Sequence, residues 1–176
     1  MQRVTPDRAQ ADNERRIANV VRMGVVEEAD YSARRVRVRM GDLLSGWLPW
    51  ATPRAAQDKT WHPVEVGEQV IMVAANGDLA QAVVLAAVNS KANPGPSDRP
   101  ELSRVVYEDG TFVEHDREAS AYTIDVNAAG TVLIHIGSSR LTMTDEAIVI
   151  ESNGSTLTLN AAGITLHGPR IDLNPD

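Results

Sequence analysis

The chain has 176 residues, a net charge of −7 and no cysteine. Its length allows one or two small domains, and the lack of thiols excludes a disulfide framework and a thiolate metal site. The negative charge argues against general nucleic-acid binding. The apolar runs are far shorter than the ~20 residues of a membrane span, and the polar N-terminus does not resemble a signal peptide. We therefore expect a chain that is made as a soluble cytoplasmic protein.

The first half of the chain predicts an arm, a barrel and a linker. Residues 1–16 are charged and are expected to form an arm or short helix with little apolar face. Residues 17–88 contain short strands, beginning at Val20-Val21, alternating at 35–40, and continuing at 69–74 and 80–85. Five or so strands with glycine-rich turns predict a small closed barrel. Residues 89–103 contain Pro94, Pro96 and Pro100 and are predicted to be a linker.

The remainder, residues 104–176, begins with a predicted meander and ends in a repeat. Strands are expected at 104–107, 112–114 and 121–126, around the turn Asp109-Gly110. A three-residue motif then recurs at 132–134, 141–143, 148–150, 157–159, 164–166 and 171–173. Its outer positions are apolar and its middle position is usually Thr or Asp, which predicts short strands with one buried face.

The spacing of this repeat predicts an assembly of several chains. Leu157, Ile164 and Ile171 are each seven residues apart, whereas one coil of a solenoid takes roughly twenty residues or more. Seven residues allow only a strand and a turn, and an uncovered apolar face costs ~1.5–3 kcal/mol per large side chain. Three copies around an axis would cover it. A flat sheet on another domain, or an ordinary sandwich, is the alternative.

We therefore predict an all-β chain that forms an intertwined homotrimeric β-prism, or β-helix, at its C-terminal end. In this prediction the apolar positions of the repeat point toward the axis and the middle positions point to solvent. The predicted trimer core consists of Ile148, Ile150, Leu157, Leu159, Ile164, Leu166, Ile171 and Leu173.

Several sequence runs resemble the baseplate assembly protein V family, the central tail spikes of P2-like contractile phages and R-type pyocins. The most specific is GDLLSGWLPW at 41–50. It is followed by TWHP at 60–63, EVGEQV at 65–70, GDL at 77–79 and YEDGTFVEHD at 107–116. The resemblance covers essentially the whole chain.

This resemblance implies an N-terminal OB-fold barrel followed by a trimeric β-helical needle. We expect no enzymatic activity, because an enzyme requires a concave pocket and a packed prism offers little of one. It implies a membrane-piercing spike in the baseplate of a phage or pyocin tail, driven through the target outer membrane when the sheath contracts. The barrel end would attach to tail hub and baseplate proteins, and our candidate attachment residues are Arg3, Arg8, Arg15 and Arg16. A type VI secretion spike, an OB-fold nucleic-acid-binding module and a receptor-binding fibre remain alternatives.

The resemblance also raises the question of a metal at the tip. Spikes of this family carry a His-x-His pair near the apex, where symmetry-related copies bind iron, but no two histidines in this chain are one residue apart. His167 is the candidate for one iron ion per trimer, and no cofactor is otherwise required. Because Ile164 and Leu166 are predicted to point inward, strand alternation favours an outward, polar His167.

Three other constellations have both chemical and structural interpretations. Arg35, Arg37 and Arg39 share one strand face, but no aromatic residue interleaves them, which favours a solvated or protein-contacting face over a nucleic-acid groove. Trp47, Trp50 and Trp61 are expected to anchor the barrel or an interface. The run Glu114-His115-Asp116 brings acid and base together in sequence only, since neighbours on a strand face opposite ways.

Overall fold

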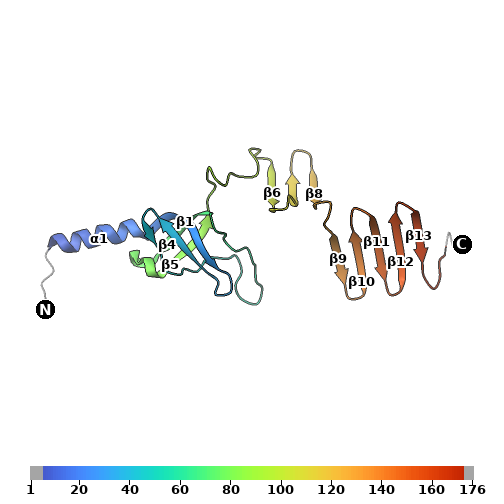
Figure 1. Cartoon of the computed structure of the whole chain (residues 1–176), viewed down its shortest axis with the longest axis horizontal. Helices are drawn as coiled ribbons and strands as arrows, with labels where there is room; N and C mark the ends of the chain where they lie inside the picture. Colours follow the sequence, from blue (N-terminus) through green and yellow to red (C-terminus); the bar gives the residue numbers. More distant parts are fainter. Residues whose placement is uncertain (1–5, 173–176) are drawn as a thin grey trace. The chain divides into compact units, whose positions relative to one another are not determined.

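A computed structural model describes residues 6–172 of the chain (Figure 1). It divides into two compact units, Met1–Gly95 and Pro96–Asp176, and the division falls inside the predicted linker. The first unit contains helix α1 and a β-barrel, and the second contains two antiparallel sheets. Within the described residues, none of the helices is both long and apolar enough to cross a membrane.

Five strands form the sheet of the first unit. They are β1 (Val21–Asp30), β2 (Arg35–Met40), β3 (Leu43–Leu44), β4 (Gln69–Ala74) and β5 (Ala82–Ala87), in the order β3-β2-β1-β4-β5. Strand β1 is long enough to pair with β4 through its first half and with β2 through its second half. Alternate residues of β2 and β4 are fully buried, as the period-2 pattern predicts.

A short segment around Pro49 closes this sheet into a barrel. Val36 of β2 and Leu48 exchange two backbone hydrogen bonds of 2.9 and 2.8 Å. On the other side, the Val84 amide donates to the Pro49 carbonyl at 2.9 Å and the Ala51 amide donates to the Val84 carbonyl at 2.7 Å, in a parallel bridge between Trp50 and β5. The circuit β1, β2, 48–51, β5, β4 confirms the predicted closed barrel.

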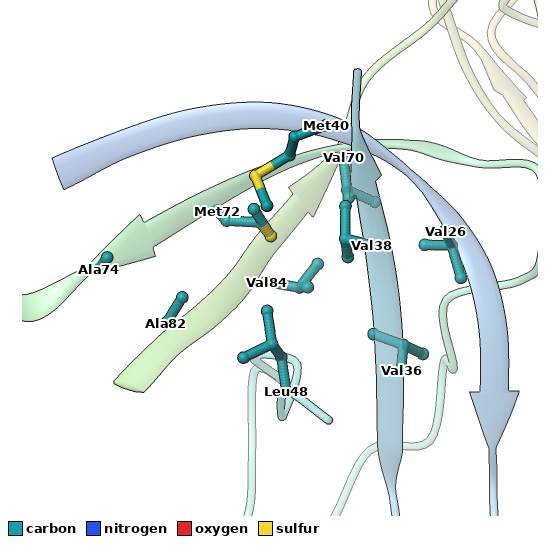
Figure 2. Packing of buried hydrophobic residues seen from close by; sticks show 10 residues of the cluster. All are labelled: Val26, Val36, Val38, Met40, Leu48, Val70, Met72, Ala74, Ala82 and Val84. Atoms are coloured by element: carbon teal, nitrogen blue, oxygen red, sulfur yellow. The ribbon is translucent and has the colours of Figure 1, made fainter. Parts of the chain in front are cut away.

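The barrel contains the hydrophobic core of the described chain (Figure 2). Ten apolar side chains, each at most 7% exposed, converge from β1, β2, β4, β5 and the closing segment. They are Val26, Val36, Val38, Met40, Leu48, Val70, Met72, Ala74, Ala82 and Val84. Most of them are small or branched, and the partly buried Trp50 packs against the cluster.

Helix α1 (Pro6–Val20) precedes the barrel and is tied to it at its last turn. Its contact is with the 3-10 turn η1 (Ala75–Gly77), where Gly77 has a φ of +70°. A Cβ atom on Gly77 would lie 2.1 Å from the Arg16 carbonyl oxygen, so only glycine allows the two backbones to approach this closely. Helix α1 ends at Val20, four residues beyond the end of the predicted arm at residue 16.

The second unit is built from hairpins alone. Strands β6 (Leu102–Val106), β7 (Phe112–Asp116) and β8 (Ala121–Asp125) form one sheet in sequence order. The other sheet is also a meander, made of β9 (Val132–Ile136), β10 (Ser139–Met143), β11 (Ala147–Ser152), β12 (Ser155–Asn160) and β13 (Gly163–His167). Five of the six repeat motifs therefore lie in strands.

Some predicted boundaries are wrong for local reasons. Val20 ends α1 rather than starting a strand, and β5 begins at Ala82 because Leu79–Gln81 forms the 3-10 turn η2, capped by the Asp78 carboxylate. The linker ends earlier than predicted, since β6 starts at Leu102. The sixth motif is also corrected: Ile171 and Asp172 lie outside any strand, after the bend at Gly168-Pro169, and Leu173 lies outside the described residues.

Candidate assembly interface

The β9–β13 sheet carries two rows of apolar side chains on one face. Directly paired residues of antiparallel strands share a face, so the register defines these rows without ambiguity. One row crosses the five strands as Ile134, Leu141, Ile150, Leu157 and Leu166. The second crosses them as Val132, Met143, Ile148, Leu159 and Ile164. We call these ten residues the apolar face.

Within the second unit, this face is only partly covered. Ile134 is 63% exposed, Ile164 is 72% exposed and Leu166 is 51% exposed. All ten fully buried apolar residues of the described chain belong to the barrel, so the second unit has no hydrophobic core of its own. A continuous exposed patch of this kind marks a surface that another molecule covers.

The opposite face of the same sheet is more polar. One of its rows consists of Leu133, Thr142, Val149, Thr158 and Thr165, and another consists of His135, Arg140, Glu151, Thr156 and His167. Arg140 and Glu151 form an ion pair with a 3.5 Å separation between nitrogen and oxygen. The predicted segregation of apolar and polar positions is present, with Leu133 and Val149 as the apolar exceptions on the polar side.

Tight turns fix the register of the sheet. The β11–β12 turn has Asn153 at φ +48° and Gly154 at φ +85°, which is the left-handed pair that a two-residue hairpin needs. The Ser138 hydroxyl of the β9–β10 turn donates to the Asn153 side chain at 2.9 Å. Because a slip of one residue would exchange the two faces, these turns hold the apolar residues together.

The predicted trimer-core residues lie largely on the apolar face. Ile148, Ile150, Leu157, Leu159, Ile164 and Leu166 are all members of it. Ile171 is half-exposed and has no strand partner, and Leu173 lies outside the described residues. The register brings the six residues together on one surface, and their role in a trimer stays a prediction.

His167 lies on the polar face, on the side of the sheet opposite to its chain neighbour Leu166. A site made of three inward-facing copies of this side chain does not fit that position. Among the described residues of one chain, three His, Cys, Asp or Glu side chains nowhere gather as a metal site would need. Iron binding by His167 stays an untested prediction, and strand alternation weighs against it.

The N-terminal arginines are only partly described. Arg8, Arg15 and Arg16 lie on α1, where Arg15 forms an ion pair of 2.6 Å with Asp12. This contact lowers the pKa of Asp12. Arg3 lies outside the described residues. The helix is exposed along most of its length, so these side chains are available to a partner.

The arginine strand β2 is largely neutralised by acidic neighbours on β1. Arg37 forms an ion pair of 2.9 Å with Glu28 and lies 5.8 Å from the Trp47 ring. Arg39 forms an ion pair with Glu27, and this hydrogen bond lowers the pKa of Glu27. These pairs favour the predicted solvated face over a nucleic-acid groove.

The tryptophans differ in how far they are buried. Trp50 packs against the core and meets Trp61 edge to face, with 5.7 Å between ring centroids and an interplanar angle of 61°. Trp47 and Trp61 are 47% and 55% exposed. Trp50 therefore fulfils the predicted anchoring role, whereas the other two present ring surface to solvent.

The acid and base of Glu114-His115-Asp116 point away from each other. Glu114 pairs with Arg104 at 3.2 Å and Asp116 pairs with Arg99 at 3.1 Å, while His115 lies opposite Tyr122 on the other face of β7, with 6.5 Å between the rings. The segment stabilises its sheet and does not bring an acid and a base to one site.

Comparisons with known proteins agree with these features. Residues 22–88 match the family model described as the type VI secretion system/phage-baseplate injector OB domain. The chain is also 34% identical over 167 residues to the spike protein of Escherichia phage P2, an alignment that covers 88% of this chain and 79% of that protein. The matched segment covers the five strands of the first unit except for Val21, the first residue of β1.

Proposed function

The chain belongs to the baseplate assembly protein V family, and from this premise we propose that three copies form the spike at the tip of a contractile injection tail. In this proposal the C-terminal sheets associate into a rigid needle that punctures the target outer membrane when the sheath contracts. The barrels attach the needle to the tail baseplate. The protein acts mechanically, as a structural component of the tail.

The observation that carries this proposal is the uncovered apolar face. Ten apolar side chains lie on one side of a five-stranded sheet whose unit has no buried apolar core. Burial of a large apolar side chain is worth ~1.5–3 kcal/mol, so covering the face provides a strong drive for association. Three copies that each contribute one wall would bury it, in a closed symmetric assembly.

The polar face suits the outside of such a needle. Threonines and the Arg140–Glu151 pair would meet solvent and keep the shaft soluble before it is used. The strand ladder of β9–β13 is continuous, since every neighbouring pair is hydrogen-bonded along its length. Bending a closed prism of this kind would break several of these bonds at once, which is the property that a piercing shaft needs.

Attachment to the tail would use the first unit. The barrel has its own hydrophobic core, and none of the core residues belongs to the apolar face. Arg8, Arg15 and Arg16 on exposed α1 remain candidate contacts with hub proteins. A role as an OB-fold nucleic-acid module is less well supported, because Glu27 and Glu28 neutralise Arg39 and Arg37 on β2.

Thiol accessibility tests the proposed arrangement, since the natural chain contains no cysteine. Leu166 and His167 are neighbours on β13 and face opposite sides of the sheet. Under reducing conditions, Leu166→Cys should be protected from a thiol reagent in the assembled protein, and His167→Cys should react rapidly. Equal reactivity of the two variants would contradict a covered apolar face.

A tail assay connects this arrangement to function. Tails that carry Leu166→Asp should fail to kill or infect their target cells, whereas tails that carry Thr165→Asp, on the polar face of the same strand, should retain activity. Retained activity of the Leu166 variant would show that puncture does not depend on the covered face.

A further inference from the structure

A groove of about 890 Å³ opens on the barrel unit, apart from the apolar face. One wall is the β1–β2 turn, with Tyr31 and Arg34, followed by Arg35 at the start of β2. The other wall consists of the closing segment, with Trp50, and the residues that follow it as far as Trp61. The two walls come from separate segments of the chain, 31–35 and 49–61, so no single motif indicates the groove.

The groove is positively charged. Its lining includes Arg34, Arg35, Arg54 and Lys59 and no carboxylate. Arg54 is paired with Asp58 at 2.7 Å, but the other three cations form no ion pair with the acidic side chains that the structure describes. In a chain with a net charge of −7, this is a local excess of unpaired positive charge.

Both walls are ordered by their own hydrogen bonds. Asp30 Oδ1 accepts from the Ala33 amide at 2.9 Å and from the Ser32 hydroxyl at 2.7 Å, which lowers the pKa of Asp30. On the other wall, the hydroxyl oxygens of Thr52 and Thr60 lie 2.6 Å apart and share a hydrogen bond. Walls that are ordered before binding reduce the entropy lost on association.

The aromatic part of the groove is partly exposed. Trp61 meets the partly buried Trp50 in an edge-to-face contact and is 55% exposed, and Tyr31 is 44% exposed. Tryptophan, tyrosine and arginine are the residues most often found at the energetic centres of protein interfaces. A partner that fits this lining combines negative charge with an apolar side chain.

We propose that this groove binds an acidic segment of another protein of the same tail. Carboxylates of that segment would meet Arg34, Arg35 and Lys59, and an apolar side chain next to them would cover the exposed ring of Trp61. The inference rests on the proposed function, because the partner is a tail component. It adds a defined attachment contact on the barrel to the candidate arginines of α1.

A single-stranded nucleic acid fits the groove less well. Such ligands follow a continuous cationic path and stack bases on exposed ring faces. The path ends at β2, where Glu28 and Glu27 neutralise Arg37 and Arg39. The edge-to-face contact between Trp50 and Trp61 also removes one ring face from stacking.

Lys59 permits a direct test, because the chain contains only one other lysine, Lys91 in the linker. A carbodiimide joins an amine to a carboxylate only when the two are in direct contact. Applied to purified assembled tails, it should couple Lys59 to an Asp or Glu of a different tail protein, identified by mass spectrometry of the joined peptides. Lys91 serves as the internal control.

Charge reversal supplies the matched variants. Arg35→Glu should reduce the Lys59 coupling about tenfold, whereas Arg117→Glu, another exposed arginine without an ion pair among the described residues, should leave it unchanged. Coupling of Lys59 to nucleic acid or to a second copy of this chain, or no coupling beyond that of Lys91, would overturn the inference.

The native mass of each variant separates this inference from the proposed function. If Lys59 finds no acidic partner while the chain remains a trimer, the groove inference fails and the spike proposal stands. If the chain is a monomer and Lys59 still couples to a tail protein, the spike proposal fails and the groove inference survives.

Discussion

Ile164→Asp provides a sharp test of the covered apolar face, with Thr165→Asp as its matched control. The two residues are neighbours on β13 and pair with Leu159 and Thr158 of β12, so they occupy opposite faces. Both substitutions introduce aspartate, which has a low β-propensity, into the same strand. The loss of strand stability from propensity alone is therefore the same in both variants. Only the face differs.

The association free energy that Ile164→Asp removes can be worked out from the exposure of Ile164 in the single chain. Ile164 is 72% exposed in the single chain, and complete burial of an isoleucine is worth ~1.5–3 kcal/mol. Covering its exposed part is then worth about 1–2 kcal/mol per chain, or ~3–6 kcal/mol for three chains. The aspartate also brings three carboxylates into a closed interface, and each adds a desolvation penalty of several kcal/mol.

Sedimentation velocity and native mass spectrometry measure the result. The loss of ~3–6 kcal/mol alone corresponds to a factor of roughly 10²–10⁴ in the trimer association constant. We expect Ile164→Asp to be monomeric or aggregated at micromolar concentration and Thr165→Asp to remain trimeric. If both variants form heat-stable trimers, the apolar face is not the interface and the inward assignment of its residues is wrong.

Three further predictions concern the rest of the chain. Gly77→Ala should detach α1 from the barrel, because its Cβ would lie 2.1 Å from the Arg16 carbonyl oxygen. Amide hydrogen exchange over residues 8–20 should therefore increase. Gly67→Ala is the control: Gly67 has a φ of +94° and open space around it, so its substitution should leave exchange in α1 unchanged. The pKa of Asp116 is lowered by the Ala119 and Glu118 amides and by Arg99, so its contribution to stability is present above the unfolded pKa of about 3.9 and is lost as pH falls through the lower folded value. Asp116→Asn should therefore reduce the thermal stability of the β6–β8 sheet at neutral pH and weaken its acid dependence, which a melting series from pH 7 downward measures. The full chain should not retard single-stranded DNA in a gel at low salt, and a salt-sensitive shift would contradict the assignment of Arg37 and Arg39 to ion pairs.

The parts of the fold that depend on local pattern were predictable from sequence. Alternation placed Val36, Val38 and Met40 inside the barrel, and the repeat placed Leu157 and Leu159 on one face. Asn153-Gly154 is a strong hairpin signal, and its left-handed backbone follows from it. These features depend on residues that are close together in the chain.

The parts that depend on tertiary contact were not predictable. The closing segment 48–51 is short and contains a proline, so it has no strand signal of its own, and its hydrogen bonds come from Val36 and Val84. The extension of α1 to Val20 is supported by the approach of Arg16 to Gly77. The last motif lacks a strand because Gly168-Pro169 interrupts the pattern before Ile171.

The cationic groove illustrates the same limit for a site. Tyr31, Arg34 and Lys59 meet Trp61 only after the barrel closes. The available sequence signals were the cluster of tryptophans and Arg35 on the arginine strand, and neither showed that they line one groove.

Native mass spectrometry of the full-length chain tests the central claim of a three-chain spike most directly. The uncovered apolar face predicts a single dominant species with three times the 19.1 kDa chain mass, persisting on dilution to nanomolar concentration. A stable, soluble monomer at micromolar concentration would contradict it.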